Sequence, residues 1–490
     1  MADWVVIASV MLVYLAIVMA IGLLSTRGYE RSVDEYVNAG RDLGFFATYF
    51  LLGAAIFSAF AFLGGPGWAY GKGAAALFIL GYCATGLWLF WLFGPKVLRL
   101  GHRYNYSTQA EFLSDRFESR WLSVLVAVVS IMAFIPYMTL QMKGCGYVVS
   151  TLTGQRIPFE LGALLAYGVV LAYVFFGGLR GVAWTNVFQG TFMICLAWFL
   201  GIYIPLKIHG GFEPMFRKIA EARPGFLLIG REGSMMTHQA FSSALLVSFL
   251  GFSCWPHLFM RLYNIRSERV LKKIVAGYPL FAIFLVPVLL VGFAGIGYVD
   301  LESKGMKADA ILPYMIQSMG LPALVIGLFG AGTLAASMST QDTITHAAAT
   351  IFVKDFYAKL LRRDLSEREV MWWIRAAVIV FGAVSYLFAV LGGESLVDLL
   401  LGAYGSIVQL LPLILSAVYV RRVTGPAVMA GLVSGVTTNY LISFGVIPSR
   451  FALGIHAGIW GLGVNIGLIV LISMIGRPQD PKHLARFELD

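Results

Sequence analysis

The sequence predicts an all-α membrane protein with about thirteen transmembrane helices. Of its 490 residues, 59% are hydrophobic and 13% are charged, the latter being about half the share of a soluble domain. Mean hydropathy is +0.80. The apolar residues gather in long stretches, without the alternation that is typical of a membrane β-barrel. These observations exclude a soluble globular protein, a disordered chain and a secreted disulfide scaffold.

A membrane helix needs about 20 mostly apolar residues. The first apolar stretch is not expected to be a cleaved signal peptide, because no basic residues precede it and its apolar run is too long. We expect no separate soluble domain, and the tail after Arg477 is too short to fold by itself. Thirteen stretches meet the length requirement, at about 4–25, 43–70, 74–98, 121–152, 158–177, 182–208, 239–260, 272–298, 322–353, 371–391, 396–420, 426–446 and 451–475.

The net charge of +10 is interpreted as a sign of topology rather than of nucleic-acid binding. If the N-terminus lies outside, 25 of the 36 Lys and Arg residues fall in inside loops and in the C-terminal tail. Basic residues favour cytoplasmic loops. One outside loop, about 209–238, carries four basic residues and partly departs from this rule. We therefore expect a multi-pass protein of the plasma or inner membrane, with its C-terminus in the cytoplasm.

The four cysteines are interpreted as small buried apolar residues, since they lie in apolar stretches without the spacing of metal ligands. They are Cys83, Cys145, Cys195 and Cys254.

Two of the predicted spans are interrupted. The second contains several small residues near Gly53 and then Gly64-Gly65-Pro66-Gly67. The seventh contains Pro256, which removes one helix hydrogen bond. The two interrupted spans are five apart, which predicts two sets of five helices in opposite membrane orientations. The expected organisation is a leading helix and loop (1–42), a first repeat (43–208), an outside loop (209–238), a second repeat (239–420), and two trailing helices with a tail (421–490).

The ninth span is rich in hydroxyl side chains and also carries Asp342. Hydroxyl residues often hold membrane helices together. The alternative is a cation site, because hard cations prefer oxygen ligands. Ser339 and Thr340 can both reach an ion beside the helix, and an acid inside a membrane is a functional candidate.

The motif Ala335-Ala336-x-x-Ser339-Thr340-x-Asp342-Thr343 resembles the ninth-span motif of the sodium/solute symporter family. That family includes sodium–glucose, proline, sialic acid and pantothenate transporters. Further motifs agree with it in order along the chain: Ala54-Ala55-x-x-Ser58, Gly64-Gly65-Pro66-Gly67, Glu111-Phe112-Leu113-x-x-Arg116-Phe117, Gly177-Gly178-Leu179-Arg180, Trp184-Thr185-Asn186-x-x-Gln189, Pro256-His257 with Arg261, and Tyr404-x-x-Ile407-x-Gln409-Leu410-x-Pro412.

This resemblance implies a sodium-coupled symporter with a five-plus-five inverted repeat. It implies Na⁺ as the coupling ion and no organic cofactor. In the family, the conserved sodium site uses backbone carbonyls and hydroxyls. The matching positions here are the carbonyls of Ala54, Phe57 and Ala336 and the hydroxyls of Ser339 and Thr340.

One position departs from the family pattern. Members with a second sodium have an aspartate after Trp-Thr in the sixth span, where this chain has Asn186. The acid is instead Asp342, on the ninth span. The sequence thus leaves two interpretations open: a second ion or proton site formed by Asn186, Ser339, Asp342 and Thr343, or a structural hydrogen bond.

The substrate is expected to lie beside the broken helices. Lys143 is the basic residue placed within a span, and it either snorkels, forms a structural pair or meets a substrate carboxylate. The second span lacks the Asn, Glu and Gln cluster expected of a sugar site. The candidate lining residues are Ser58, Phe60, Phe62, Gln141, Lys143, Trp255, His257, Tyr404 and Gln409.

The function predicted from the sequence is import of a small, partly apolar carboxylate, such as a monocarboxylate or a pantothenate-like acid. A proline-like amino acid and a sugar are the alternatives within the same class. A membrane sensor that acts with a separate partner is the alternative from another class. No enzyme is expected, because the spans show neither paired carboxylates nor a metal-ligand spacing. The expected partners are the small organic solute and the lipid bilayer.

Overall fold

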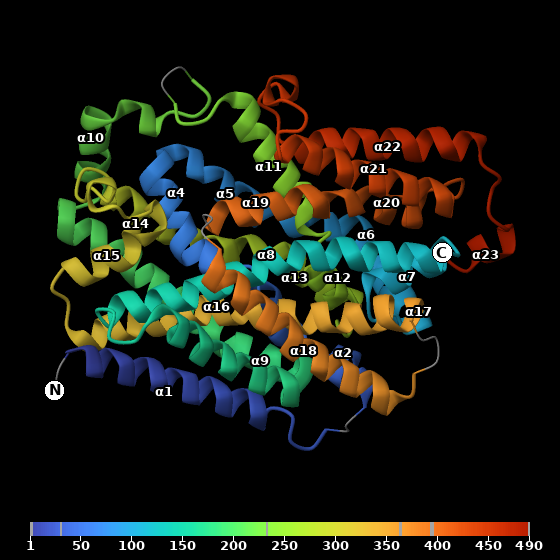
Figure 1. The fold of residues 1–490 in the computed structure, drawn as a ribbon, viewed down its shortest axis with the longest axis horizontal. Helices are drawn as coiled ribbons and strands as arrows, with labels where there is room; N and C mark the ends of the chain where they lie inside the picture. The colour runs from blue at the N-terminus through green and yellow to red at the C-terminus, as the bar shows by residue number, and fades with distance from the viewer. Residues whose placement is uncertain (1–2, 30–31, 232–233, 362–364, 393–395, 489–490) are drawn as a thin grey trace.

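The protein is a bundle of helices that run mostly along one direction, so that the loops lie at two opposite ends (Figure 1). The structure, a computed structural model, describes residues 3–29, 32–231, 234–361, 365–392 and 396–488. Within these ranges the extended pairings are two isolated bridges, Leu43 with Ile265 and Gly230 with Thr237. Large apolar side chains cover the outer faces, with Ile475 81% exposed, as expected of a surface in contact with lipid.

The helices follow the predicted order. The leading part is α1 (Asp3–Leu24) and α2 (Val33–Asn38). The range predicted for the first repeat contains α3 (Phe45–Ala54), the π-helical turn η2 (Phe60–Gly64), α4 (Gly65–Lys72), α5 (Leu77–Thr85), α6 (Leu89–Tyr104), α7 (Gln109–Arg116), α8 (Arg120–Leu152) and α9 (Phe159–His209).

The second half begins after α10 (Phe212–Ala222), which lies in the predicted outside loop. Its elements are α11 (His238–Phe252), α12 (Pro256–Phe259), η6 (Met260–Tyr263), α13 (Glu268–Ala282), α14 (Leu285–Gly295), α15 (Ile311–Ser318), α16 (Ala323–Ile351), η9 (Phe352–Tyr357), α17 (Ala358–Leu360), α18 (Glu367–Leu391), α19 (Leu396–Ile407) and α20 (Leu411–Tyr419). The chain ends with α21 (Gly425–Ser443), α22 (Ala457–Ile475) and α23 (Pro481–Ala485).

The number of spans differs from the predicted thirteen. Nine described helical runs are long and apolar enough to cross a membrane, or ten if the bent pair His238–Phe252 and Pro256–Tyr263 forms one span. The count of thirteen is therefore not confirmed. One reason is that neighbouring spans join without a loop, as in the single 51-residue run of α9. A second is that α21 falls outside the nine, because its Gly, Ser, Thr and Asn residues lower its hydropathy.

The two ends of the bundle hold different short helices. We call the end that holds α2, α7, α17 and α23 the basic end, since Arg41, Arg99, Arg116, Lys354 and Arg375 lie there; α10 and α15 lie at the opposite end (Figure 1).

A turn inside α9 returns the chain through the bundle. A straight helix of 51 residues would be about 75 Å long, more than twice the thickness of the hydrocarbon core. Gly178, with φ 53° and ψ −152°, breaks the run between the two predicted spans. A Cβ atom at Gly178 would lie 2.7 Å from the backbone oxygen of Tyr36. Only glycine fits this conformation and this close approach.

The core of the bundle is α16. Every residue from Phe329 to Ile351 is buried, and α16 packs against α1, α8, α9 and α18. A helix that is buried on all sides presents all of its polar residues to other protein segments. The hydroxyls of the ninth predicted span and Asp342 are therefore shielded from lipid.

The segment after Arg477, which is expected to be too short to fold by itself, packs against the rest of the protein. Gln479 and Arg116 exchange two hydrogen bonds, and Arg486 forms an ion pair with Asp115 at 3.2 Å. Phe487 is 6% exposed. A sequence pattern of this length does not reveal docking, because the contacts come from α6 and α7.

Three of the four cysteines are buried, as predicted, but Cys195 is exposed. All four are free thiols. The exposure of Cys195 on α9 has a simple reason, since that face of the helix lies on the outside of the bundle, where an apolar thiol is at no disadvantage in lipid.

We predict that Gly178→Ala destabilises the protein by about 3 kcal/mol, through backbone strain and the clash with Tyr36. The midpoint of thermal unfolding in detergent measures this effect. Gly168→Ala is the matched control, because Gly168 lies in the same helix with open space around it, and its stability should rise by less than about 1 kcal/mol. Equal midpoints for the two variants would contradict the assignment of a glycine-specific turn.

Candidate functional site

The first predicted break is present between α3 and η2. Residues 55–58 form turns and bends rather than a continuous helix. The Ala59 N–H donates to Gln141 Oε1 of α8 at 2.9 Å, and the Phe60 N–H donates to Ser58 Oγ at 3.2 Å. In a bilayer, backbone groups freed by a break need partners inside the protein. Gln141 thus provides an acceptor for the Ala59 N–H, which the break leaves without a partner in its own helix. The Gln141 Nε2 in turn donates to the Tyr137 carbonyl.

The second predicted break is also present. The helix α11 ends at Phe252, and α12 begins at Pro256 with a bend of 41° between the two arms. Ser253 Oγ donates to the Gly86 carbonyl at 2.6 Å and so anchors the break to the first repeat. Each set of five helices therefore begins with a broken helix, as the sequence predicts.

The first break meets α16 through hydroxyl groups. Ser339 Oγ lies 3.0 Å from the Ala54 carbonyl oxygen and 3.2 Å from that of Ala336, and Thr340 Oγ1 lies 3.5 Å from the latter. All four residues are fully buried. We call this group the α3–α16 junction. It consists of neutral oxygen atoms, the ligands that suit a hard cation such as Na⁺.

Phe57 is the fifth residue that the sequence assigns to this region. It lies in the irregular segment three residues after Ala54, so its carbonyl belongs to the same break. Its ring packs against Phe281 and Phe284, with centroids 5.0 and 3.9 Å away. The Phe57 side chain thus packs the broken segment against α13 and the residue that precedes α14. The predicted role of Phe57 in ion binding requires only its backbone oxygen.

A second polar cluster surrounds Asp342, one turn further along α16. Asp342 Oδ2 accepts hydrogen bonds from Tyr173 at 2.7 Å and Thr185 at 3.4 Å. Its Oδ1 accepts from Asn186 at 3.3 Å and Thr343 at 3.0 Å. Thr343 also donates to the Ser339 carbonyl at 3.2 Å, which links this cluster to the α3–α16 junction.

Asn186 faces Asp342, as the sequence suggests. Within the described part of the chain, Asn186 Oδ1 is buried without a hydrogen-bond partner. A buried amide oxygen that lacks a donor is costly. This oxygen, beside a carboxylate and two hydroxyls, is consistent with the open interpretation of an ion site.

Sequence reasoning missed Tyr173 and Thr185 as neighbours of Asp342. Tyr173 precedes the turn at Gly178, and Thr185 follows it. The turn brings the two halves of α9 together on the same carboxylate. The only signal was the Gly177-Gly178 pair, which does not show which side chains will meet.

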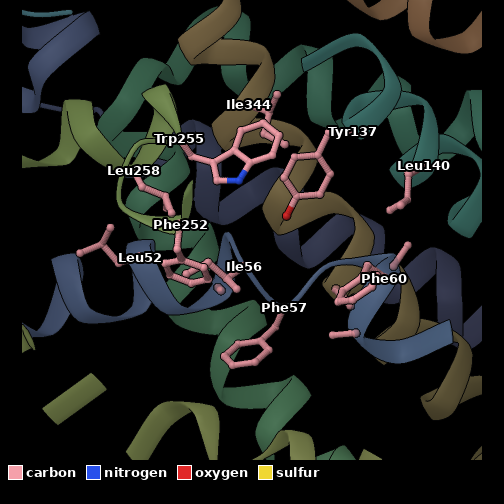
Figure 2. Close-up of a cluster of buried hydrophobic side chains, with 14 of the residues drawn as sticks. Leu52, Ile56, Phe57, Phe60, Tyr137, Leu140, Phe252, Trp255, Leu258 and Ile344 are labelled. Carbon is pink, nitrogen blue, oxygen red and sulfur yellow. The ribbon is translucent and has the colours of Figure 1, made fainter. Parts of the chain in front are cut away.

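Aromatic side chains fill the space between the two breaks. Trp255 contacts Tyr137 at 5.1 Å, Tyr404 at 5.5 Å and Phe134 at 6.0 Å between ring centroids. Figure 2 shows Trp255 and Tyr137 side by side above the irregular segment that carries Ile56 and Phe57. The Tyr137 side chain lies beside that of Ser58. We call Tyr137, Trp255, His257 and Tyr404 the aromatic cluster.

Two polar atoms of the aromatic cluster are available for a ligand. Trp255 Nε1 and His257 Nδ1 are buried and have no hydrogen-bond partner among the described residues. The His257 ring lies 5.6 Å from Trp255 and 6.1 Å from Tyr137. The cluster therefore combines apolar ring faces with a small number of polar atoms, as solute sites commonly do.

Four other candidate residues have surroundings of their own, outside the aromatic cluster. Gln409 Nε2 donates to the Gly405 and Gly458 carbonyls, which turns it toward α22. Phe62 packs near Phe284, 6.0 Å between ring centroids. Lys143 is 3% exposed and its ammonium lies beside Gly392, at the end of α18. Phe60 is buried in the turn that follows the first break.

Polar contacts connect the second break to the basic end. Arg261 donates to the His257 carbonyl at 3.0 Å and to Asn264 Oδ1 at 3.3 Å. Asn264 Nδ2 donates to Asn38 Oδ1 at 3.1 Å, and Asn38 Nδ2 donates to Ser107 Oγ at 3.0 Å. Asn264 directly follows η6 and Ser107 precedes α7, so these contacts join α2 to the segments beside η6 and α7.

Glu111 completes this connection. Its carboxylate pairs with Lys354 at 2.7 Å and accepts hydrogen bonds from the Ser107 and Thr108 N–H groups. Burial raises the pKa of the Glu111 carboxyl, but the Lys354 ammonium and these N–H groups outweigh burial, so the pKa lies below its ordinary value. The ion pair joins α7 to η9, directly after α16.

The opposite end of the bundle contains a cavity of about 500 Å³. Its lining includes Leu63 after the first break, Tyr147 on α8 and Gly392, the residue beside which the Lys143 ammonium lies. Asp309 also lines it and lies against Gly67 of α4, where a Cβ atom would be 2.6 Å from the Asp309 carboxylate. The absence of a side chain at Gly67 thus allows the segment around Asp309 to pack closely against α4.

Two broken helices that meet a buried, hydroxyl-rich helix are typical of a class of membrane transporters. The model of the sodium:solute symporter family matches residues 36–435, and the chain belongs to that family. The uncharacterized symporter YhjB of Bacillus subtilis is 31% identical, with 93% of this chain and 94% of that protein covered. The sodium/pantothenate symporter of Escherichia coli is 29% identical, covering 88% and 90%.

The fold is shared with solved membrane transporters. A Na⁺-coupled sialic acid symporter in a substrate-bound outward-open state superposes with a TM-score of 0.78, at 20% identity over 97% of this chain and 99% of that one. Mhp1, a nucleobase-cation-symport-1 family transporter in a closed conformation, gives 0.59 at 14% identity over 94% and 99%. The predicted inverted repeat is confirmed. The protein is a multi-pass membrane symporter with Na⁺ as its coupling ion, and not an enzyme.

Proposed function

We propose that this symporter imports a small organic carboxylate together with Na⁺ bound at the α3–α16 junction. The observation that carries the proposal is the contact of Ser339 Oγ with the Ala54 carbonyl at 3.0 Å. It joins a freed backbone oxygen of the broken helix to a hydroxyl of the buried helix, in a fully buried position. The proposed ligands are the carbonyls of Ala54, Phe57 and Ala336 and the hydroxyls of Ser339 and Thr340.

Sodium binding at this junction would replace the hydrogen bonds of the two hydroxyls with contacts to the ion. In the structure, Ser339 and Thr340 point toward the same carbonyl oxygens that the ion needs. Na⁺ between these groups takes up the lone pairs of both the hydroxyls and the carbonyls. The ion therefore replaces weak hydrogen bonds and orders the irregular segment after Ala54.

The irregular segment that the ion orders is in direct contact with the proposed solute site. Ser58 follows Phe57 in the irregular segment, and its side chain lies beside Tyr137 of the aromatic cluster. Sodium thus prepares the solute site, and by linkage a bound solute strengthens sodium binding. Movement of one repeat against the other then exposes the site to the opposite side of the membrane.

We assign the solute to the aromatic cluster and its polar atoms. The ring faces of Tyr137, Trp255 and Tyr404 favour a small, partly apolar molecule, and the cluster lacks the amide and acid groups that recognise a sugar. The Lys143 ammonium lies beside Gly392, which lines the cavity at the opposite end. An ammonium there favours entry of an anion. Relatives named for pantothenate and proline transport both act on carboxylates.

We also propose a second cation or proton site at Asp342. Asp342 and its donors Tyr173, Thr185, Asn186 and Thr343 form a fully buried cluster, and Asn186 Oδ1 remains without a donor. Arg261 is the cation whose charge acts on Asp342, but no ion pair neutralises this carboxylate among the described residues. A buried carboxylate in that state favours either a bound cation or a proton.

The basic end faces the cytoplasm in this proposal, which places the N-terminus outside and the C-terminus inside. The 25 of 36 Lys and Arg residues that fall in the predicted inside loops and tail support this orientation. Solute and Na⁺ then enter through the cavity lined by Leu63 and Gly392 and leave past the contacts of Asn38 and Asn264.

Uptake into reconstituted vesicles tests the function. We expect radiolabelled lactate, pyruvate or pantothenate to accumulate only with an inward Na⁺ gradient, and proline and glucose to accumulate less. Lys143→Ala should lower uptake of the transported acid about tenfold, since about 1.4 kcal/mol of attraction is lost. Lys207→Ala, an exposed lysine at the same end, is the control and should change uptake little. Uptake of every acid that is independent of both Na⁺ and Lys143 would contradict the proposal.

The sodium site is tested with Ser339→Ala. Loss of one hydroxyl ligand should raise the Na⁺ concentration for half-maximal uptake about tenfold, and reduce the thermal stabilisation of the purified protein by NaCl relative to choline chloride. Ser337→Ala is the control, because that hydroxyl donates to the Thr333 carbonyl of its own helix. If both variants respond to Na⁺ like the unchanged protein, the junction does not bind the ion.

The second site is tested with Asp342→Asn. The number of cations carried per solute, measured from reversal potentials in vesicles, should be lower in the variant than in the unchanged protein. Asp355→Asn replaces the buried acid of η9, whose Oδ1 accepts from Ser123, and should leave the ratio unaltered. The same ratio in Asp342→Asn and the unchanged protein rules out an ion or proton at Asp342.

A further inference from the structure

A second cavity lies at the basic end, separate from the ion and solute sites. It has a volume of about 540 Å³ and is bounded by the end of α1, by α2, by α9 near its turn and by the beginning of α18. The lining residues that matter here are Leu23, Arg27, Glu35, Tyr36, Phe176 and Arg375. No residue of the α3–α16 junction or of the aromatic cluster takes part in it.

The cavity carries an excess of positive charge. Its acid, Glu35, is already paired with Arg180. Arg27 is exposed at the rim. Arg375 is held within the wall, where its guanidinium lies over the rings of Tyr36 and Phe175 at 5.5 and 5.3 Å.

Arg375 is fixed in place but not fully satisfied. Its Nε is buried and, within the described part of the chain, has no hydrogen-bond partner. An N–H donor left without an acceptor in a buried position is costly. The guanidinium is the group best suited to bind a phosphate through several parallel hydrogen bonds. The unpaired Arg375 Nε–H and the adjacent cavity are therefore suited to a ligand with anionic oxygen atoms.

The surroundings of the cavity are apolar and open to lipid. Phe176 is 62% exposed and Trp372, three residues before Arg375, is 73% exposed. Tryptophan is typical of the boundary between the hydrocarbon core and the headgroups. A ligand in this cavity thus has charged groups on one side of it and lipid-facing apolar side chains on the other.

We propose that this cavity binds the phosphate of an anionic phospholipid, whose headgroup contacts Arg375 and Arg27 and whose acyl chains lie along Leu23 and Phe176. Basic pockets between membrane helices on the cytoplasmic side suit such headgroups. A soluble phosphate ion shares this chemistry, but the apolar rim favours the lipid.

A lipid at this position bridges three elements. Tyr36 Oη donates to the Val174 carbonyl at 2.8 Å, and the Tyr36 carbonyl contacts His346 Nε2 of α16 at 3.0 Å. The headgroup therefore adds a tie between α1, α2 and α18, next to the connection of α2 with the buried helix. We expect the bound lipid to stabilise the purified protein.

The experiment is native mass spectrometry of the full-length protein after delipidation and addition of phosphatidylglycerol or phosphatidylcholine. The unchanged protein should retain phosphatidylglycerol in preference, and Arg375→Gln should lower the retained amount about fivefold. Arg27→Gln, at the exposed rim, should lower it about threefold and decides the question if Arg375→Gln does not fold. Arg368→Gln is the matched control, because Arg368 is exposed on the same helix outside the cavity.

Three results would overturn the proposal. The first is equal retention of the two lipids by the unchanged protein, and the second is retention of phosphatidylglycerol by Arg375→Gln and Arg27→Gln at the level of Arg368→Gln. The third concerns the source of the phosphate. If inorganic phosphate raises the thermal unfolding midpoint as much as phosphatidylglycerol does, and only when Arg375 is present, the ligand is a soluble anion and not a lipid.

Discussion

The contact between the Ser339 hydroxyl and the Ala54 carbonyl is the interaction on which the arrangement of the site depends. A helix that unwinds inside a membrane frees backbone oxygens that neither lipid nor water can satisfy. The buried helix α16 supplies the hydroxyl, and Gln141 of α8 accepts from the freed N–H on the other side of the break. The break is therefore stable without an ion, while its oxygens remain grouped where a cation can replace the hydrogen bonds.

The burial of α16 determines which groups can bind its polar side chains. Because Phe329–Ile351 is enclosed by other helices, Asp342 has to find its partners in the protein, and it takes four donors from α9 and α16. One oxygen, Asn186 Oδ1, is left over. Because the helices around α16 pack closely, the ion region lies next to the aromatic cluster. Hydrogen bonds from Arg261 to Asn264 and from Asn264 to Asn38 continue toward the basic end.

Some residues play different structural parts from those that their position in a span suggests. Gln409 lies in the eleventh predicted span but faces α22, because the trailing helices pack on that side. The tail after Arg477 docks on α7 through Gln479 and Arg486. Lys143, six residues and about 9 Å along α8 from Tyr137, lies beside Gly392 rather than in the aromatic cluster. In each case the deciding contact comes from a segment distant in the chain.

The sequence by itself determined the membrane class, the broken helices and the oxygen-rich segment of α16, because hydropathy, Pro and Gly positions and hydroxyl spacing are local properties. It also indicated the family to which the chain belongs. Only the tertiary structure decided that Tyr173 and Thr185 share a carboxylate, that the turn at Gly178 joins two predicted spans, and that Arg375 lines a second cavity. These features arise from contacts between helices. Contacts of that kind depend on how faces pack in three dimensions, and a linear pattern of residue types does not record them.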